Sequence, residues 1–426
     1  MRLNRLTTTG LVTTCAIGLA LSGCSVKDPE AGGIGGGGGG ARGIKTDVGV
    51  TSDTITLGAM TDESGVFKVL GLGITQGNQM WAADVNKSGG ICGRKIKIVP
   101  ADTGYSAEKA VPLYNQLKGQ ALGLVQLIGS PILAALKKPM VNDKIAAIPS
   151  SWASTNLDVP NVVMVGPTYD VEMINGLSYL QSQGKIKNGD TIGHIYVDSE
   201  YGKNGLLGSK YYASKHSMNV VQAPVSSTAS DLTSAVTKLK GAGAKAVLLT
   251  TTPAQTASAV GVAKAQGLTV PFYGSGPTYT PQLLDTPAGS ALLSGQFLTD
   301  ALMVPWNSTV PQAASIRSQW TKDNPKGEPT FGPIQGYVFG LVWGQILLQA
   351  CSDGDLTRAG VLKAVQKVSV DTRNLTASLD FTHPGQPSTR AQFLMKPARV
   401  PGGLDLVQPQ AYVSKEALSY KTPFQK

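Results

Sequence analysis

Residues 54–102 read TITLGAMTDESGVFKVLGLGITQGNQMWAADVNKSGGICGRKIKIVPAD, and this stretch decides the fold. Short runs rich in β-branched residues stand at 54–60 and 95–102, and an amphipathic stretch through 77–90 lies between them. A second amphipathic stretch, SAEKAVPLYNQLKG, follows at 106–119. Strands that alternate with helices are typical of βαβ units, so the pattern predicts a parallel sheet.

The same alternation extends through most of the chain. After 54–60 and 95–102, the first series continues with expected strands at 121–130, 146–151 and 162–167, and the second series has expected strands at 191–198, 219–225, 245–252 and 270–276. Continuous apolar strands suit sheets that helices cover on both faces. The chain is therefore expected to be an α/β protein with two successive doubly wound units. Expected helices near 311–323, 333–351 and 355–367 would return to cover the first unit.

Composition narrows the class of protein. The chain has 426 residues, 42% hydrophobic and 15% charged, which is too apolar for disorder and too mixed for a polytopic membrane protein. The formal net charge is +10, but the charges are dispersed and no basic run is flanked by stacking aromatic residues. This pattern argues against a nucleic-acid partner.

The first residues have the features of a targeting signal. Residues 1–23 hold two arginines, no acid and an apolar stretch too short to span a bilayer stably. The ending Leu21-Ser22-Gly23-Cys24 resembles a bacterial lipobox, which implies that Cys24 becomes lipid-modified and holds the protein on the extracytoplasmic face of the cell membrane. The alternative is a soluble secreted protein with a chance cysteine at this position. Residues 24–47 contain a run of glycines and are expected to form a flexible tether.

Cysteine usage agrees with an exported protein. Cys15 lies in the signal and Cys24 is the lipid site, which leaves Cys92 and Cys351 in the folded body. An even number of cysteines in an oxidising compartment favours a Cys92–Cys351 disulfide. The alternative is a pair of unpaired buried thiols.

The ends of the expected strands indicate where a ligand would bind, because ligands of open α/β sheets bind beyond the carboxyl ends of the strands. These ends are rich in glycine and small hydroxyl residues, at 61–65, 129–130, 150–154, 250–252 and 274–276. Such loops present backbone N–H and hydroxyl groups to a small polar ligand.

The order of the motifs resembles that of the type I periplasmic binding proteins of ABC importers, in the leucine/isoleucine/valine-binding family. The resemblance covers nearly all of residues 48–415. It rests on ITLGAMTDESG (55–65), DVNKSGGICGRKIKIVPADTGYSAEKA (84–110), IGSP (128–131), VDSEYGKNGL (197–206), DLTSAVTKLKGAGAKAVLLTTTP (231–253) and AKAQGLTVPFYGSG (263–276).

The resemblance implies two α/β lobes joined by a three-segment hinge, with the ligand enclosed between them. The first lobe would hold residues 48–170 and 300–378, and the second would hold residues 171–299 and 379–426. The family also implies a monomer that binds a small molecule and needs no cofactor.

The resemblance further implies a set of ligand-binding residues. Ser130 falls where the family uses a hydroxyl and a backbone amide to hold a ligand carboxylate or an equivalent polar head. The other positions are Ser64, Ser151, Ala153, Tyr169, Tyr201 and Thr252. Trp152 has no counterpart in the family pattern and would either stack on a flat ligand or fill the core.

One departure from the family pattern concerns the ligand's amine. Amino-acid receptors of this family place an acid in the loop after the last strand of the second lobe, whereas residues 273–277 here read YGSGP. Four acids in neighbouring loops could replace it: Asp170, Glu172, Asp198 and Glu200. The alternative is that each of them is a solvated surface acid. The ligand is therefore expected to be an amino acid, an amide, or an aromatic or other carboxylate.

These observations predict a solute receptor that delivers its ligand to a membrane permease with separate ATPase subunits. The alternative is a ligand sensor that acts on a partner protein. Catalysis is not expected, since the sequence has no G-x-S-x-G motif, P-loop or convincing acid pair. No metal site is expected either, because the only histidines, His194, His216 and His383, stand in no metal-binding motif.

Overall fold

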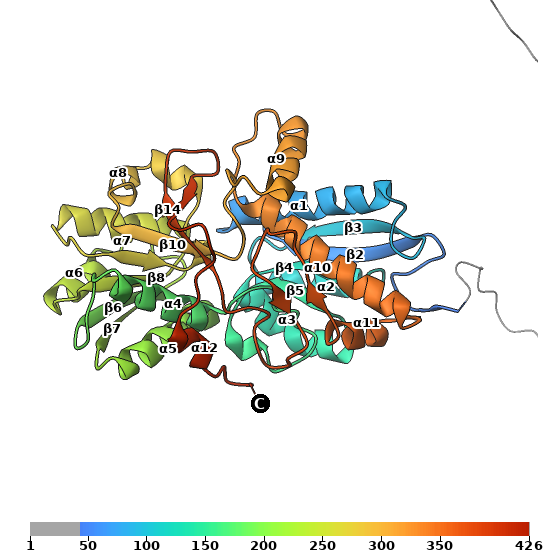
Figure 1. Ribbon diagram of the computed structural model, residues 1–426, viewed down its shortest axis with the longest axis horizontal. Coiled ribbons are helices and arrows are strands. Elements are labelled where there is room, and N and C mark those ends of the chain that lie inside the picture. Colours follow the sequence, from blue (N-terminus) through green and yellow to red (C-terminus); the bar gives the residue numbers. More distant parts are fainter. Residues whose placement is uncertain (1–42, 426) are drawn as a thin grey trace, which may run out of the picture. The chain divides into compact units, whose positions relative to one another are not determined.

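The computed structural model describes residues 43–425. The first lobe is built on a four-stranded parallel sheet with the order β3-β2-β4-β5 (Figure 1). Its strands are β2 (Thr54–Thr61), β3 (Lys95–Asp102), β4 (Gly123–Ile128) and β5 (Ala147–Ser150). Every residue of β4 and β5 is buried, which explains why their sequences are mainly apolar, with Gln126 and Ser150 as the polar exceptions.

Helices cover this sheet on both sides. α1 (Lys68–Lys87) and α10 (Gly332–Ser352) pack against each other, and Figure 1 shows α1 and α3 (Ser130–Asn142) on opposite sides of the strands. α2 (Ala107–Leu117) packs beside α3. α10 is long and apolar enough to cross a membrane, but most of it is buried inside the protein, as befits a core helix.

The contact between α1 and α10 is made backbone to backbone. A Cβ atom on Gly336 would overlap the carbonyl oxygen of Ile74, and one on Gly77 would overlap that of Pro333. Glycine is therefore required at both positions for the helices to approach this closely. The same contact fixes the first turns of α10, which line the cavity described below.

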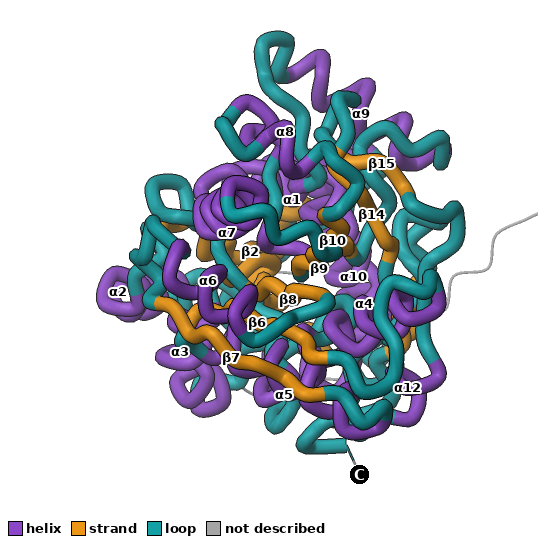
Figure 2. The backbone as a smooth tube through the Cα atoms, turned by 90° about the vertical axis from the view of Figure 1, so that its left-hand side faces the viewer, coloured by secondary structure: helices purple, strands orange, loops and turns teal. Residues whose placement is uncertain are grey.

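The second lobe contains a seven-stranded sheet with the order β15-β14-β10-β9-β8-β6-β7, which Figure 2 shows from the side of this lobe. The strands from β6 to β10 are parallel, and β14 and β15 are antiparallel. They are β6 (Thr191–Val197), β7 (Asn219–Val225), β8 (Ala246–Thr250), β9 (Phe272–Gly274), β10 (Phe297–Ala301), β14 (Phe393–Pro397) and β15 (Leu404–Leu406). The helices of this lobe are α4 (Tyr169–Ser182), α5 (Glu200–Lys215), α6 (Thr233–Gly241), α7 (Pro253–Ala265), α8 (Gly289–Leu292) and α12 (Lys415–Ser419).

The chain passes between the sheets after β5, after β10 and after β13. The second passage leads into α9 (Pro311–Asp323), α10 and α11 (Arg358–Val365), and α9 and α11 pack on α10. The remaining elements are β1 (Lys45–Thr46), β11 (Asp355–Leu356), β12 (Ser369–Val370), β13 (Leu379–Asp380), and the short 3-10 helices η1 (Ser154–Asn156), η2 (Gly276–Thr278) and η3 (Pro281–Asp285).

The α/β class with two largely parallel sheets is confirmed, and three local expectations are corrected. Residues 162–167 form no strand: Val162 makes a single bridge to Ala147, Gly166 has a φ of 113°, and Pro167 has no N–H. No strand was expected at β10, which spans the expected lobe boundary at residue 300, or at β14 and β15.

The third correction concerns the tether. Residues 24–47 were expected to be flexible, but Lys45 and Thr46 form β1 and pair with β11. The signal segment 1–23, Cys24 and the tether up to residue 42 lie outside the described residues.

Cys92 and Cys351 form a disulfide with their Cα atoms 6.5 Å apart. The bond joins the segment after α1 to the last turn of α10, so it fastens the same pair of helices that the glycines bring together.

Candidate functional site

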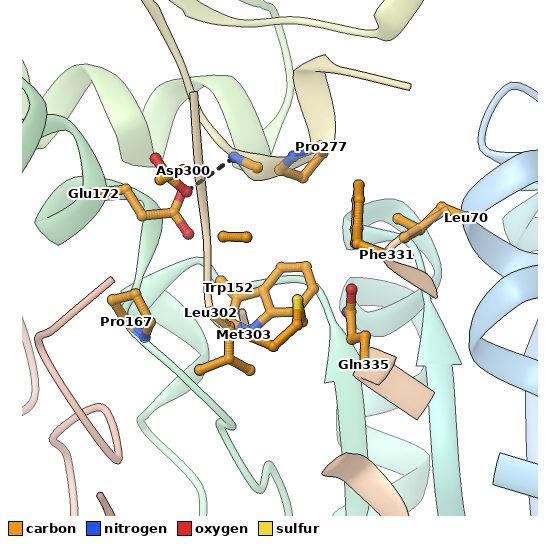
Figure 3. A pocket seen from close by; sticks show the side chains of 12 residues that line it. Leu70, Trp152, Pro167, Glu172, Pro277, Asp300, Leu302, Met303, Phe331 and Gln335 are labelled. Carbon is orange, nitrogen blue, oxygen red and sulfur yellow. Dashed lines mark hydrogen bonds between the residues drawn. The ribbon is translucent and has the colours of Figure 1, made fainter. Parts of the chain in front are cut away.

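Two adjoining cavities lie between the lobes. The first is called the Ser130 cavity and is lined by Phe67, Leu70, Tyr105, Ile128, Ser130, Ser150, Tyr169, Tyr201 and Pro277. The second is called the Glu172 cavity and is lined by Leu70, Trp152, Pro167, Glu172, Gly276, Pro277, Asp300, Ala301, Leu302, Met303, Phe331 and Gln335 (Figure 3). Leu70 and Pro277 belong to both walls, so the two cavities adjoin.

Hydroxyl groups gather at one side of the Ser130 cavity. Ser130 is the first residue of α3, and Gly129 before it has a φ of 110°, which favours glycine at this tight turn from strand to helix. Ser130 Oγ lies 2.7 Å from Ser151 Oγ, and Ser150 Oγ is buried without a partner in the described part of the chain. In the first turn of α3, the backbone N–H groups of Ser130 and Ile132 add further donors, whereas Pro131 has none. This corner can hold an anionic or polar head without a cationic side chain.

Two tyrosines form another part of the wall of the Ser130 cavity. The rings of Tyr169 on α4 and Tyr201 on α5 have centroids 4.6 Å apart. Tyr201 Oη lies 2.6 Å from Ser275 Oγ, which fixes the ring. Burial raises the pKa of both phenols well above the usual value, so both remain uncharged.

The Glu172 cavity is mainly apolar. Trp152 Nε1 donates a 2.7 Å hydrogen bond to the carbonyl of Val165, which satisfies the indole and leaves its ring as a wall. Leu302, Met303 and Phe331 complete this surface, as Figure 3 shows. Such a surface suits the apolar body of a ligand.

Two carboxyl groups interrupt the apolar surface. Asp300 accepts hydrogen bonds from Tyr273 Oη at 2.9 Å and from the backbone N–H of Gly276 at 3.1 Å. Burial raises the pKa of Asp300 to about 7. The pKa of Glu172 is raised well above its ordinary value by burial, by Asp300 and by Asp170. Both carboxyl groups therefore hold their protons to higher pH than exposed acids do.

Comparison with known proteins identifies the family. The family model described as periplasmic binding protein matches residues 54–399. The chain belongs to this family. The solved structure of a fatty acid ABC transporter substrate-binding protein from Thermomonospora curvata is 36% identical, with a TM-score of 0.86 over 90% of this chain and 98% of that one.

Two more distant proteins are also similar to this chain. A branched-chain amino acid ABC transporter protein from Thermus thermophilus with bound valine is 16% identical, with a TM-score of 0.74 over 86% of this chain and 98% of that one. An amino acid binding protein from Pseudomonas aeruginosa is 24% identical over 58% of this chain and 66% of its own length, just under two thirds. These relatives place the periplasmic binding protein among the substrate-binding proteins of ABC transporters, which bind solutes rather than act as enzymes.

The binding protein brings half of the predicted site residues together. Ser130, Tyr169 and Tyr201 line the Ser130 cavity, and Trp152 lines the Glu172 cavity. Thr252 caps α7 and lines a neighbouring groove that also contains Tyr201.

The other three predicted residues line neither the two cavities nor the neighbouring groove. Ser64 is exposed and its Oγ donates to Asp102 Oδ2 at 2.8 Å, whereas Phe67 and Leu70 from the next turn reach the ligand space. Ser151 touches the site only through Ser130, and Ala153 is fully buried beside it.

The candidate acids have different surroundings. Asp198 forms an exposed ion pair with Lys203, and Asp170 is buried among donors that include Ser154, Thr168 and Tyr420. Glu200 accepts a hydrogen bond from Thr155. Of the four, Glu172 alone lines the Ser130 or the Glu172 cavity, whereas Asp198 lines the neighbouring groove that contains Thr252.

Sequence reasoning missed Asp300, Phe331 and Gln335. Asp300 lies near the end of β10, a strand that was not predicted. The sequence FLTDA of this strand ends in Asp-Ala, and an acid at the end of a strand in a parallel sheet could have indicated a site residue. Phe331 directly precedes α10 and Gln335 lies in its first turns. This helix was expected only to cover the first lobe, and nothing in its apolar pattern marks its first turns as a site.

Proposed function

We propose that this protein is the lipid-anchored, extracytoplasmic solute receptor of an ABC importer and that its ligand is an apolar carboxylate. The cavity between the lobes carries the proposal. Its two parts have aromatic and aliphatic walls, a cluster of hydroxyls at one corner, and no lysine, arginine or histidine among their lining residues.

The hydroxyl corner supplies the recognition of the carboxylate. A buried carboxylate needs several oriented donors, because an unpaired buried charge is very costly. Ser130 Oγ, Ser150 Oγ and the first-turn N–H groups of α3 are such donors. Tyr169 and Tyr201 would enclose the first part of the ligand's apolar chain.

The apolar body of the ligand would extend past Leu70 and Pro277 into the Glu172 cavity. Trp152, Phe331 and Met303 give this region an apolar surface that an α-amino acid with a short side chain would leave unfilled. The fatty acid binding protein of Thermomonospora curvata, at 36% identity, supports a ligand of this class.

Capture would proceed by closure of the lobes. Ser130, Trp152 and Phe331 belong to one lobe, and Tyr201, Glu172 and Leu302 to the other, so a ligand that touches both stabilises the closed arrangement. The permease, with its ATPase subunits, would recognise the closed form. A lipid at Cys24 would keep the receptor near the permease and raise its local concentration there.

A thermal-shift screen tests the ligand class. Straight-chain and aromatic carboxylates are expected to raise the Tm of the purified protein, because a ligand that binds only the folded state stabilises it. Branched-chain amino acids and short amides of equal concentration are expected to raise it less. A response confined to amino acids would contradict the proposed class.

A Cys24→Ser variant tests the anchor. The unmodified protein is expected in the membrane fraction and to incorporate a labelled fatty acid, whereas the variant is expected to do neither. Equal membrane association of both proteins would refute lipid attachment at Cys24.

A further inference from the structure

The Ser130 cavity is narrow. It offers about 20 Å³, which is room for about one water molecule. A carboxylate can therefore bind at Ser130 only if part of the cavity wall moves. The question is which residues of the wall let a ligand pass.

The neighbouring groove that contains Thr252 and Asp198 is larger and is called the outer groove. It offers about 290 Å³, and three of its lining residues, Val66, Asp198 and Ser227, are exposed, so it opens to solvent. The residues that line both this groove and the Ser130 cavity are all aromatic: Phe67, Tyr105 and Tyr201. These rings therefore separate the outer groove from the Ser130 cavity.

Tyr105 has an unfavourable backbone conformation. Its φ of 58° lies in the left-handed region, where a Cβ atom is costly for residues other than glycine. Hydrogen bonds hold the loop in this shape: Asp102 Oδ1 accepts from the backbone N–H groups of Glu63 at 2.8 Å and Gly104 at 2.9 Å. These bonds join the loop after β2 to the loop after β3. Such strain persists where the surroundings fix it, and it is common at ligand sites.

The ring of Tyr105 packs on both Phe67 and Gly129. The ring centroids of Tyr105 and Phe67 are 4.9 Å apart, and a Cβ atom on Gly129 would lie 2.9 Å from Tyr105 Cε2. Gly129 directly precedes Ser130, so the strained loop places its aromatic ring against the turn that begins the hydroxyl corner. Phe67 is fixed as well, because its backbone N–H donates to Asp62 Oδ2 at 2.9 Å.

We propose that the Tyr105 ring, packed on Phe67, is the gate of the Ser130 cavity: a carboxylate enters from the outer groove, contacts this ring and then reaches Ser130. This inference rests on the proposed function and adds a ligand-contacting residue and an entry route to it. Neither Tyr105 nor Phe67 was among the predicted site residues. Both belong to the first lobe and Tyr201 to the second, so separation of the lobes parts the rings.

A gate and a passive wall differ in their effect on kinetics. Loss of a wall contact mainly raises the dissociation rate constant of the ligand and leaves the association rate constant nearly unchanged. Loss of a gate raises both rate constants, because the barrier between groove and cavity is shared by entry and exit. The association rate constant therefore separates the two roles.

Stopped-flow kinetics with straight-chain carboxylates from hexanoate to dodecanoate tests the gate. Tryptophan fluorescence reports binding, since Trp152 lines the adjoining Glu172 cavity. Tyr105→Gly is expected to raise the association rate constant about tenfold and the dissociation rate constant about thirtyfold, so that the Kd rises only about threefold.

Further variants separate the ring from the backbone strain. Tyr105→Gly loses the packing of the ring but relieves the left-handed conformation, and because these effects offset, the Tm is expected to change by less than about 4 °C. Tyr105→Asn, a second small side chain that tolerates this conformation, is expected to accelerate exchange in the same way. Tyr105→Phe keeps the ring, so its rate constants are expected to stay within about twofold of those of the unmodified protein.

Lys144→Gly is the matched control. Lys144 has a φ of 55°, is exposed, and lines neither cavity nor the outer groove. Glycine there relieves the same kind of strain far from the ligand path, so both rate constants are expected to be unchanged.

The adverse results differ in meaning. An unchanged association rate constant in both Tyr105→Gly and Tyr105→Asn would overturn the gate and leave the proposed function intact. Acceleration by Tyr105→Phe as large as that by Tyr105→Gly would overturn the ring as the barrier. Failure of every carboxylate in the series to bind the unmodified protein would overturn the proposed function and the gate with it.

Discussion

Thr155 Oγ1 donates a 2.6 Å hydrogen bond to Glu200 Oε1 across the boundary between the lobes. Asn156 Nδ2 donates to the other oxygen of the same carboxylate at 3.3 Å. η1, which holds Thr155 and Asn156, follows β5 of the first lobe, whereas Glu200 begins α5 of the second. One half-buried carboxylate therefore holds together the two lobes that enclose the cavity.

Replacement of this carboxylate is expected to weaken ligand binding. Hydrogen bonds to a charged group contribute about 1.5–3 kcal/mol each when buried, so Glu200→Ala at this half-buried site is expected to raise the Kd about five- to thirtyfold. Calorimetric titration with a carboxylate that raises the Tm measures the change. Asp198→Ala is the control, because its ion pair with Lys203 is exposed and lies within α5 and the residues before it. Equal Kd values for the two variants would contradict the role of Glu200.

Gly336 is expected to be critical for stability. An alanine there would overlap the backbone carbonyl of Ile74, so Gly336→Ala is expected to lower the free energy of unfolding by about 2 kcal/mol or more. Denaturation in urea gives the value. Gly241→Ala is the matched control, since a Cβ there meets no atom within 4 Å, and it is expected to be neutral or slightly stabilising. A neutral Gly336→Ala would refute the close approach of α1 and α10.

The disulfide is expected to stabilise the fold without shaping the ligand site. It closes a loop of 259 residues, and removal by Cys92→Ser with Cys351→Ser is expected to lower the free energy of unfolding by about 2–5 kcal/mol. Cys351 lies about 24 Å along α10 from Gln335, at 1.5 Å per residue, so the Kd is expected to change less than about twofold. A large rise in Kd with an unchanged free energy of unfolding would contradict the prediction that the disulfide stabilises the fold without shaping the ligand site.

Asp300 is expected to make stability depend on pH. Its pKa rises on folding from 3.8 to about 7, so between these values the folded protein holds a proton that the unfolded chain has lost. The contribution of Asp300 is therefore most favourable at low pH and falls as pH rises toward 7, by on the order of 1.4 kcal/mol per unit of pKa shift.

Asp300→Asn isolates this contribution. The free energy of unfolding of the unmodified protein minus that of the variant is expected to decrease between about pH 4 and about pH 7 and then level off. Asparagine can still accept a hydrogen bond at this position, so the variant is expected to fold. A difference that stays constant with pH would show that Asp300 titrates normally.

The fold was more predictable than the site. The expected strands from 54–60 to 270–276 recur in the structure, apart from 162–167, because long β-branched runs between helical stretches leave few alternatives. β14 and β15 were not predicted, because they are joined to the sheet by antiparallel pairs and follow the part of the chain in which strands alternate with helices.

The polar side of the site followed from the family resemblance, while its apolar side did not. Ser130, Tyr169 and Tyr201 lie on loops and helix starts that directly follow predicted elements. Gln335 and Phe331 reach the cavity only because α10 returns from far along the chain and packs on α1. A local sequence pattern does not predict such a long-range contact.

The structure of the protein with a bound medium-chain carboxylate tests the central claim most directly. The account predicts the ligand carboxylate within hydrogen-bond distance of Ser130 Oγ and Ser150 Oγ, and its chain between Trp152 and Phe331. A ligand bound outside the cavity between the lobes, or one whose polar head lies among Trp152 and Phe331 with no contact to Ser130, would contradict it.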